Sequence, residues 1–243
     1  MNTIIASLIG ILGLVAGVFI APQLSPDAPP PEPAAAVMAN DQEPSSVDYL
    51  SARPYVASAP SSPLSDAERA SIIFMREEEK LARDVYTVLY ERWGLPIFTN
   101  IAQSEQTHTE AVRTLLEKYA VPDPVADDTI GVFVNDDLRA LYTRLTEEGS
   151  RSLEDALRVG AMIEDLDLKD LATQSASVDN EDILFVYDNL ARGSRNHLRA
   201  FVRQLESRGT TYTPQYISES EYQAIIASDR ETGGKGMKRG WGN

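Results

Sequence analysis

The clearest helix signals of the chain lie in the stretch SDAERASIIFMREEEKLARDVYTVLYERW, residues 65–93. Ser65 and Glu68 form a capping-box pattern, in which each side chain satisfies a free N–H group at a helix start. The apolar residues that follow are three, four or seven positions apart, so they share one helix face: Ile72, Met75, Ala82, Tyr86, Leu89 and Trp93. Gly94 ends this helix, and Pro96 suits the first position of the next.

The same signals predict three more long helices. The second runs from Pro96 to about Tyr119, the third starts near Ser152, and the fourth spans about 181–207. Shorter helices are expected at about 136–148 and after the capping pattern Ser218–Glu221. No alternating strand pattern competes, and the one long connection can run the length of a bundle. The prediction is an all-α fold: a ferritin-like four-helix bundle with one long crossover, a short helix in that crossover and a short C-terminal helix.

The two ends of the chain differ from this central part. Residues 4–20 carry no charge and would span roughly 26 Å as a helix, close to the ~30 Å of a bilayer core. Residues 1–21 are therefore interpreted as a signal peptide or a membrane anchor. Residues 22–64 hold ten of the fourteen prolines and predict a disordered tether. The folded domain is expected over 65–228, followed by a glycine-rich flexible tail, 229–243.

This organisation predicts export. The domain would be membrane-anchored and face outside the cytoplasm, or be periplasmic or secreted if the signal is cleaved.

The composition excludes several classes of function. The chain has 37 acidic and 22 basic residues and a net charge of −15, which disfavours nucleic acid as a partner. It has no cysteine, which excludes thiol nucleophiles, cysteine–zinc sites and iron–sulfur clusters.

Ionisable residues lie on the predicted inner face of each long helix. A carboxylate aimed into a bundle core is costly unless something compensates it. The candidate metal ligands are Glu79 on the first helix, Glu105 and His108 on the second, Glu164 and Asp167 on the third, and His197 on the fourth. The four carboxylates would balance two divalent cations, and oxygen and imidazole ligands without thiolate suit iron or manganese. Each pattern alone has an ordinary structural interpretation, and a metal-free bundle with a buried polar network is an alternative.

The same residues carry a family resemblance. The stretch from Glu79 to Tyr86 resembles the first-helix motif of the rubrerythrin branch of ferritin-like proteins. The pairs Glu105-x-x-His108 and Glu164-x-x-Asp167 resemble the second and third motifs. The segments EEEKLARDVY, SEQTH, GSRNHLRAF and YISESEY are more similar still to the family known as domain of unknown function 2202, over about 65–228.

The fourth motif departs from the pattern. The usual Glu-x-x-His is here Ser194-x-x-His197, so one carboxylate is missing at the expected place. Either Asp167 supplies it from the third helix, or the second metal is weakly held and the site is mononuclear.

The resemblance implies a dinuclear site, with two iron ions per chain or manganese instead, that oxidises Fe(II) with O₂ or peroxide as a ferroxidase or peroxidase. Glu79 and Glu164 would bridge, each histidine would bind one metal, and Tyr86 would be a hydrogen-bond donor or radical site. Since the chain has no cysteine, turnover would need an external electron donor. A homodimer is left open. The alternative is a non-enzymatic metal-binding or structural module of the cell envelope. An open coordination position facing an apolar channel would favour redox chemistry.

Overall fold

The computed structural model describes residues 54–60 and 62–232. Those residues form helices and no strand, which confirms the all-α prediction. The helices are α2 (Asp66–Trp93), α3 (Pro96–Lys118), α4 (Asp136–Gly149), α5 (Leu153–Ser175), α6 (Glu181–Glu206) and α7 (Glu219–Ala227). Within the described ranges no helix is both long and apolar enough to cross a bilayer. The expected signal or anchor, 1–21, lies outside the described residues, as do most of the tether and the tail from 233.

Local chemistry sets the helix ends close to where the sequence predicts them. The Ser65 side chain accepts a hydrogen bond from the Glu68 N–H, and the Glu68 carboxylate accepts one from the Ser65 N–H. Gly94 ends α2 with a left-handed φ of 63°, which a glycine adopts without strain. The Ser152 and Ser218 side chains likewise each accept a hydrogen bond from the N–H three residues on, at the starts of α5 and α7. These interactions depend only on neighbours in the chain.

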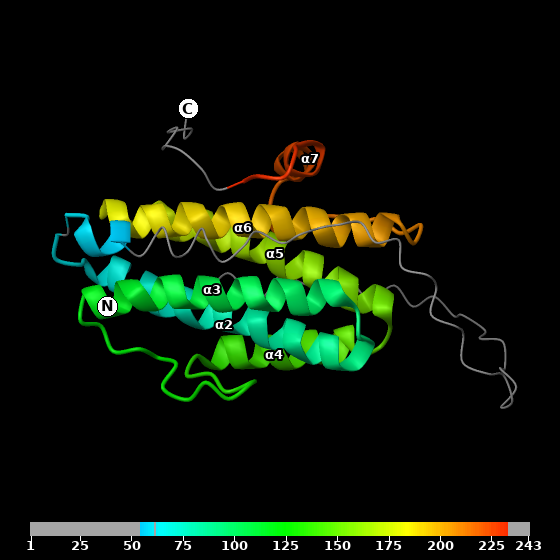
Figure 1. Ribbon diagram of the computed structural model, residues 1–243, viewed down its shortest axis with the longest axis horizontal. Helices are drawn as coiled ribbons and strands as arrows, with labels where there is room; N and C mark the ends of the chain where they lie inside the picture. Colours follow the sequence, from blue (N-terminus) through cyan, green and yellow to red (C-terminus); the bar gives the residue numbers. More distant parts are fainter. Residues whose placement is uncertain (1–53, 61, 233–243) are drawn as a thin grey trace, which may run out of the picture. The chain divides into compact units, whose positions relative to one another are not determined.

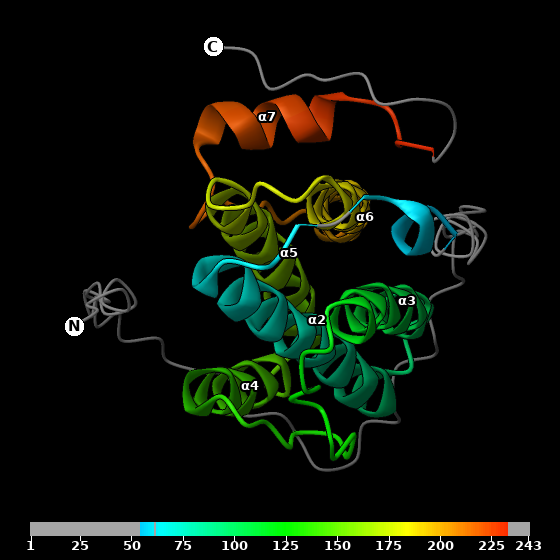
Figure 2. The same ribbon diagram turned by 90° about the vertical axis from the view of Figure 1, so that its left-hand side faces the viewer.

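The long helices form two hairpins. Helix α2 packs against α3, and α5 packs against α6, while α2 also lies beside α5 and α3 beside α6 (Figure 1). Helix α4 lies in the long crossover and packs on the outer side of α2 and α5, and α7 packs on α6 (Figure 2). The four long helices therefore enclose a common interior, whose buried apolar residues form two clusters, and a side chain on the inner face of any of these helices can reach this interior.

A polar face of α2 holds the crossover. Glu77, which points away from the apolar stripe, is buried and accepts a 3.1 Å hydrogen bond from the Asn135 N–H at the start of α4. Lys80 and Asp84 form a buried ion pair of 2.5 Å, and Lys80 also donates to the Thr129 carbonyl. These contacts explain why α2 carries buried charges on the side that does not face the core.

The folded part extends past both predicted boundaries, 65 and 228. Residues 54–58, assigned above to the tether, form a short helical turn whose Val56 is 1% exposed. Lys118 donates to the Ala59 carbonyl at 2.9 Å and ties this turn to α3. Beyond α7, Glu231 accepts hydrogen bonds from Arg195 and Arg199 of α6. Proline disfavours a long helix here, but it does not prevent side chains from packing on a neighbouring core.

Candidate metal centre

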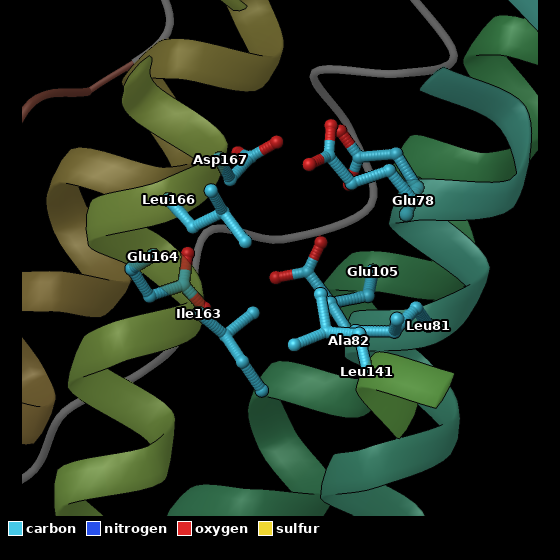
Figure 3. A pocket seen from close by; sticks show the side chains of 10 residues that line it. Glu78, Leu81, Ala82, Glu105, Leu141, Ile163, Glu164, Leu166 and Asp167 are labelled. Carbon is cyan, nitrogen blue, oxygen red and sulfur yellow. The ribbon is translucent and has the colours of Figure 1, made fainter. Parts of the chain in front are cut away.

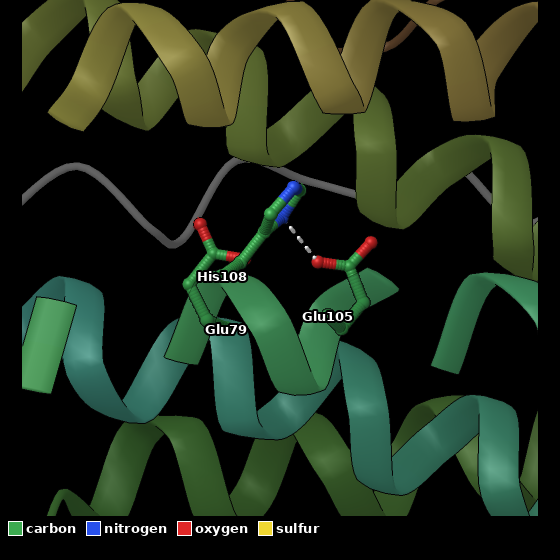
Figure 4. A group of neighbouring side chains, drawn as sticks. All are labelled: Glu79, Glu105 and His108. Carbon is green, nitrogen blue, oxygen red and sulfur yellow. Dashed lines mark hydrogen bonds and ion pairs between the residues drawn. The ribbon is translucent and has the colours of Figure 1, made fainter. Parts of the chain in front are cut away.

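The four long helices bring all six predicted ligands to one place in the core. They are Glu79 from α2, Glu105 and His108 from α3, Glu164 and Asp167 from α5, and His197 from α6. In α3 and α5 the two ligands are three residues apart, which places them on the same face one turn apart. The four carboxylate residues and His197 are buried, and His108 is mostly so. Figure 4 shows how Glu79, Glu105 and His108 converge from α2 and α3.

Glu105 lies between the two histidines. Its Oε2 is 2.7 Å from His108 Nδ1, and its Oε1 is 2.8 Å from His197 Nδ1. The imidazole rings are stacked with their centroids 5.6 Å apart. Glu105 thus belongs to two groups, one with Glu79 and His108 and one with Glu164 and His197, and within each group the potential ligand atoms lie within 4.8 Å of one another. The family resemblance implies that Glu79 and Glu164 bridge the metals, whereas in the structure Glu105 is the residue common to both groups.

The outer contacts of the cluster orient its members. His108 Nδ1 is 3.2 Å from Glu79 Oε2, and His197 Nδ1 is 3.4 Å from Glu164 Oε2. The Tyr86 hydroxyl donates to Glu164 Oε1 at 2.5 Å. Ser104, which the sequence analysis did not single out, lies with its Oγ 3.0 Å from His197 Nε2. Only the packing of α3 against α6 reveals that contact.

Asp167 faces the position where the fourth motif lacks its carboxylate. The Ser194 hydroxyl donates a short hydrogen bond to Asp167 Oδ2. Asp167 is not a member of either three-residue group. The carboxylate from α5 therefore reaches the α6 position that a glutamate would otherwise occupy, while it stays at the margin of the cluster.

The pKa values of the carboxylates in this core shift in different directions. Burial raises the pKa of Glu79 well above its usual value, and the charges of Asp167 and Glu105 raise it further. Burial also raises the pKa of Asp167 to about 8, although the Ser194 hydrogen bond opposes the shift. Glu105 differs because its two imidazole partners outweigh burial and lower its pKa. Conversely, Glu105 and Glu164 overcome burial and raise the pKa of His197 to about 10.

The residues fit divalent metal ions. Among the described residues nothing donates a hydrogen bond to Glu79 Oε1 or Asp167 Oδ1, although both atoms are buried. A buried acceptor without a partner costs about 1–3 kcal/mol. The ion pairs of Glu79, Glu105 and Glu164 within the described residues are with the two histidines. Cations would satisfy the remaining oxygens, and a carboxylate and imidazole set without thiolate suits iron or manganese.

A small cavity adjoins the cluster (Figure 3). It offers about 10 Å³ to the centre of a water-sized sphere, which is room for about one water molecule or ion. Its walls combine carboxylates with apolar side chains: Glu78, Glu79, Glu105, Glu164 and Asp167 with Leu81, Ala82, Leu141, Ile163 and Leu166. Glu78 was not predicted as a site residue, and the available signal was its place at the edge of the inner stripe of α2.

The fold and the site define a class: a helical bundle protein with a buried carboxylate and histidine cluster. The family model described as "Uncharacterized protein domain (DUF2202)" matches residues 68–229, so the chain belongs to that family. It is similar to "Uncharacterized protein MJ0754" of Methanocaldococcus jannaschii, with 59% identity over 179 residues that cover 74% of this chain and 97% of that protein. A crystal structure of hypothetical protein MJ0754 matches with a TM-score of 0.71 and covers 72% of this chain and 99% of the other.

Proposed function

We propose that this protein is a ferritin-like metal-binding protein whose cluster holds two iron ions and oxidises Fe(II) with O₂ or peroxide. One observation carries the proposal: a buried set of carboxylates and imidazoles, with oxygens that lack donors, borders a small cavity that apolar side chains close on its other side. A purely structural metal site is usually closed by its ligands. The cavity beside the ligands instead leaves one water-sized position open, where an oxygen atom of an oxidant could approach the metal, and this favours redox chemistry over a structural role.

The position of each side chain in the cluster indicates which metal ion it would hold. Glu105 contacts both histidines and belongs to both groups, so it would help to hold metal in each of them. His108 and Glu79 complete one group, and His197 and Glu164 complete the other. Asp167 borders the cavity, where it can serve as a further ligand for one ion.

Several groups around the ligands fix their orientation. Tyr86 donates to Glu164, and Ser104 contacts His197 through the nitrogen that faces away from Glu105. Such outer contacts hold the ring and carboxylate planes in place and typically change metal affinity by about 10–100-fold when they are lost. Burial raises the pKa of the Tyr86 hydroxyl well above its usual value, so Tyr86 stays a hydrogen-bond donor at neutral pH.

Two ferrous ions in this site would supply one electron each to O₂ or peroxide. The apolar walls formed by Leu81, Leu141 and Leu166 restrict water beside the carboxylates. Because the chain has no cysteine, the electrons for repeated turnover come from an external donor. The uncharged segment 4–20 supports a location outside the cytoplasm, either anchored or released after cleavage.

Metal analysis tests the proposal directly. The metal-free full chain, titrated with Fe(II) under argon, is expected to bind close to two ions, and peroxide should then oxidise both. The double variant Glu105→Ala/His108→Ala should lose most of the metal, whereas Glu147→Ala, an exposed carboxylate on α4, should retain it. Equal binding by the double variant and the wild type would refute the site. Two tightly held ions that do not react with O₂ or peroxide would instead support the structural alternative.

A further inference from the structure

Glu78 is a buried carboxylate without a donor. It is 5% exposed, and neither of its oxygens receives a hydrogen bond from any residue between 54 and 232 that the structure describes. Its neighbours on α2 differ in this respect, because Glu77 accepts from backbone N–H groups and Glu79 contacts His108. A buried carboxylate in this state is costly unless a proton or a cation occupies the space beside it.

The groups around Glu78 are themselves acidic. Burial raises the pKa of Glu78 well above its usual value, and Asp170 and Asp167 of α5 raise it further. Figure 3 shows Glu78 and Asp167 extending toward one another across the cavity from α2 and α5. Glu78 and Asp167 thus face the cavity from two helices, and the Asp170 side chain interacts with Glu78 from outside the cavity lining. The oxygens of these three carboxylates are the ligand type that hard divalent cations prefer.

These carboxylates also form a path inward. Asp170 lies one helical turn from Asp167, about 4.5 Å along the α5 axis. Asp170 is partly exposed, whereas Asp167 and Glu78 are buried. The cavity wall then continues to Glu79 and the rest of the cluster. A cation arriving from solvent would meet Asp170 first, then Glu78 with Asp167, and then the metal centre.

We propose that Glu78, Asp167 and Asp170 form a loading site that takes up divalent cations and passes them to the dinuclear centre. This inference rests on the proposed function, since it needs a centre to receive the ion. Asp167 is the member shared by both sites: it faces Glu78 on one side and the Ser194 position on the other. Glu78 and Asp170 belong to the loading site alone.

The rate of metal uptake tests this inference. The metal-free full chain is mixed rapidly with Co²⁺, and uptake is followed by the optical absorption of the bound ion. Glu78→Gln and Asp170→Asn keep the side-chain shape and remove the charge. Each is expected to slow uptake by about tenfold or more, in line with the loss of a focused negative potential. Both variants should still bind two ions at equilibrium. Asp188→Asn, an exposed carboxylate on α6, serves as the matched control and should load at the wild-type rate.

The outcomes separate the two proposals. Unchanged uptake rates in both variants, with two ions bound, overturn the loading site and leave the dinuclear centre intact. A loss of one bound ion in Glu78→Gln makes Glu78 a ligand of the centre and also overturns the loading role. Absence of metal binding by the wild type overturns the proposed function itself. Slow uptake in both variants, which alter different helices, supports the loading site and is not explained by a folding defect in one of them.

Discussion

Gly193 on α6 provides a sharp test of the arrangement around His108. A Cβ atom added at this position would lie 2.5 Å from both Cε1 and Nε2 of the His108 ring. Ordinary van der Waals contact begins near 3.4 Å, so in Gly193→Ala the ring must move by about 1 Å. His108 Nδ1 is now 2.7 Å from Glu105 and 3.2 Å from Glu79, and a shift of that size breaks at least one of these contacts.

The free-energy terms set the expected size of the effect. Overpacking a core costs about 1–3 kcal/mol. Replacing glycine by alanine within a helix stabilises the helix by about 1 kcal/mol, which offsets part of this cost. The metal-free variant should therefore unfold with a free energy up to about 2 kcal/mol below that of the wild type. Losing a contact that orients a ligand typically weakens metal binding by about 10–100-fold, so one of the two ions should bind with an affinity reduced by at least that order.

Two measurements check this prediction. Denaturant unfolding of the metal-free protein gives the stability change, and Mn²⁺ titration gives the two affinities. In Gly193→Ala/His108→Ala the clash partner is absent, so the cost of the alanine should largely disappear, with a coupling energy of about 1 kcal/mol or more. Gly149→Ala, whose Cβ would meet Leu89 at 2.7 Å instead of a ligand, is the control that should leave metal affinity unchanged. Wild-type affinity for both ions in Gly193→Ala would refute the placement of His108.

Three further predictions concern the rest of the domain. Asp167→Ala should lose about half of the bound metal and remain folded, while Ser194→Glu should bring no gain because that position already contacts Asp167; equal metal content in Asp167→Ala and wild type contradicts this. Burial raises the pKa of Glu68, but hydrogen bonds from Ser65 and Asn180 outweigh burial and lower this pKa from 4.5 to about 2. A shift of this size corresponds to about 3 kcal/mol of folding stability at neutral pH. Glu68→Gln should therefore lower the unfolding free energy at pH 7, and the difference should shrink as the pH falls from 4.5 toward 2; a difference that does not depend on pH argues against the charge. A chain that begins at residue 62 should give a mainly helical circular dichroism spectrum but unfold with about 2 kcal/mol less free energy than one that begins at residue 54, because it loses the burial of Val56.

Sequence pattern was enough to place the helices and to assign the candidate ligands to their inner faces. Ser65, Gly94 and Ser152 end or begin helices through contacts with residues at most four positions away, so local pattern is enough to place them. The three-residue spacing of the ligand pairs on α3 and α5 fixes a common face for each pair, since the helical period is 3.6 residues. The absence of cysteine limited the site to carboxylate and imidazole ligands.

How those faces meet follows from the packing of the helices and could not be predicted from the sequence. The central place of Glu105, the contact between Ser194 and Asp167, and the burial of Glu78 all depend on which neighbouring helix covers which side. The burial of Val56 could likewise not be predicted, because a proline-rich segment shows no periodic pattern of apolar residues. The physical reason is the same in each case. A helix period assigns a direction to every side chain, but contacts between residues far apart in the chain follow from the relative rotation and axial position of packed helices, which no local pattern encodes.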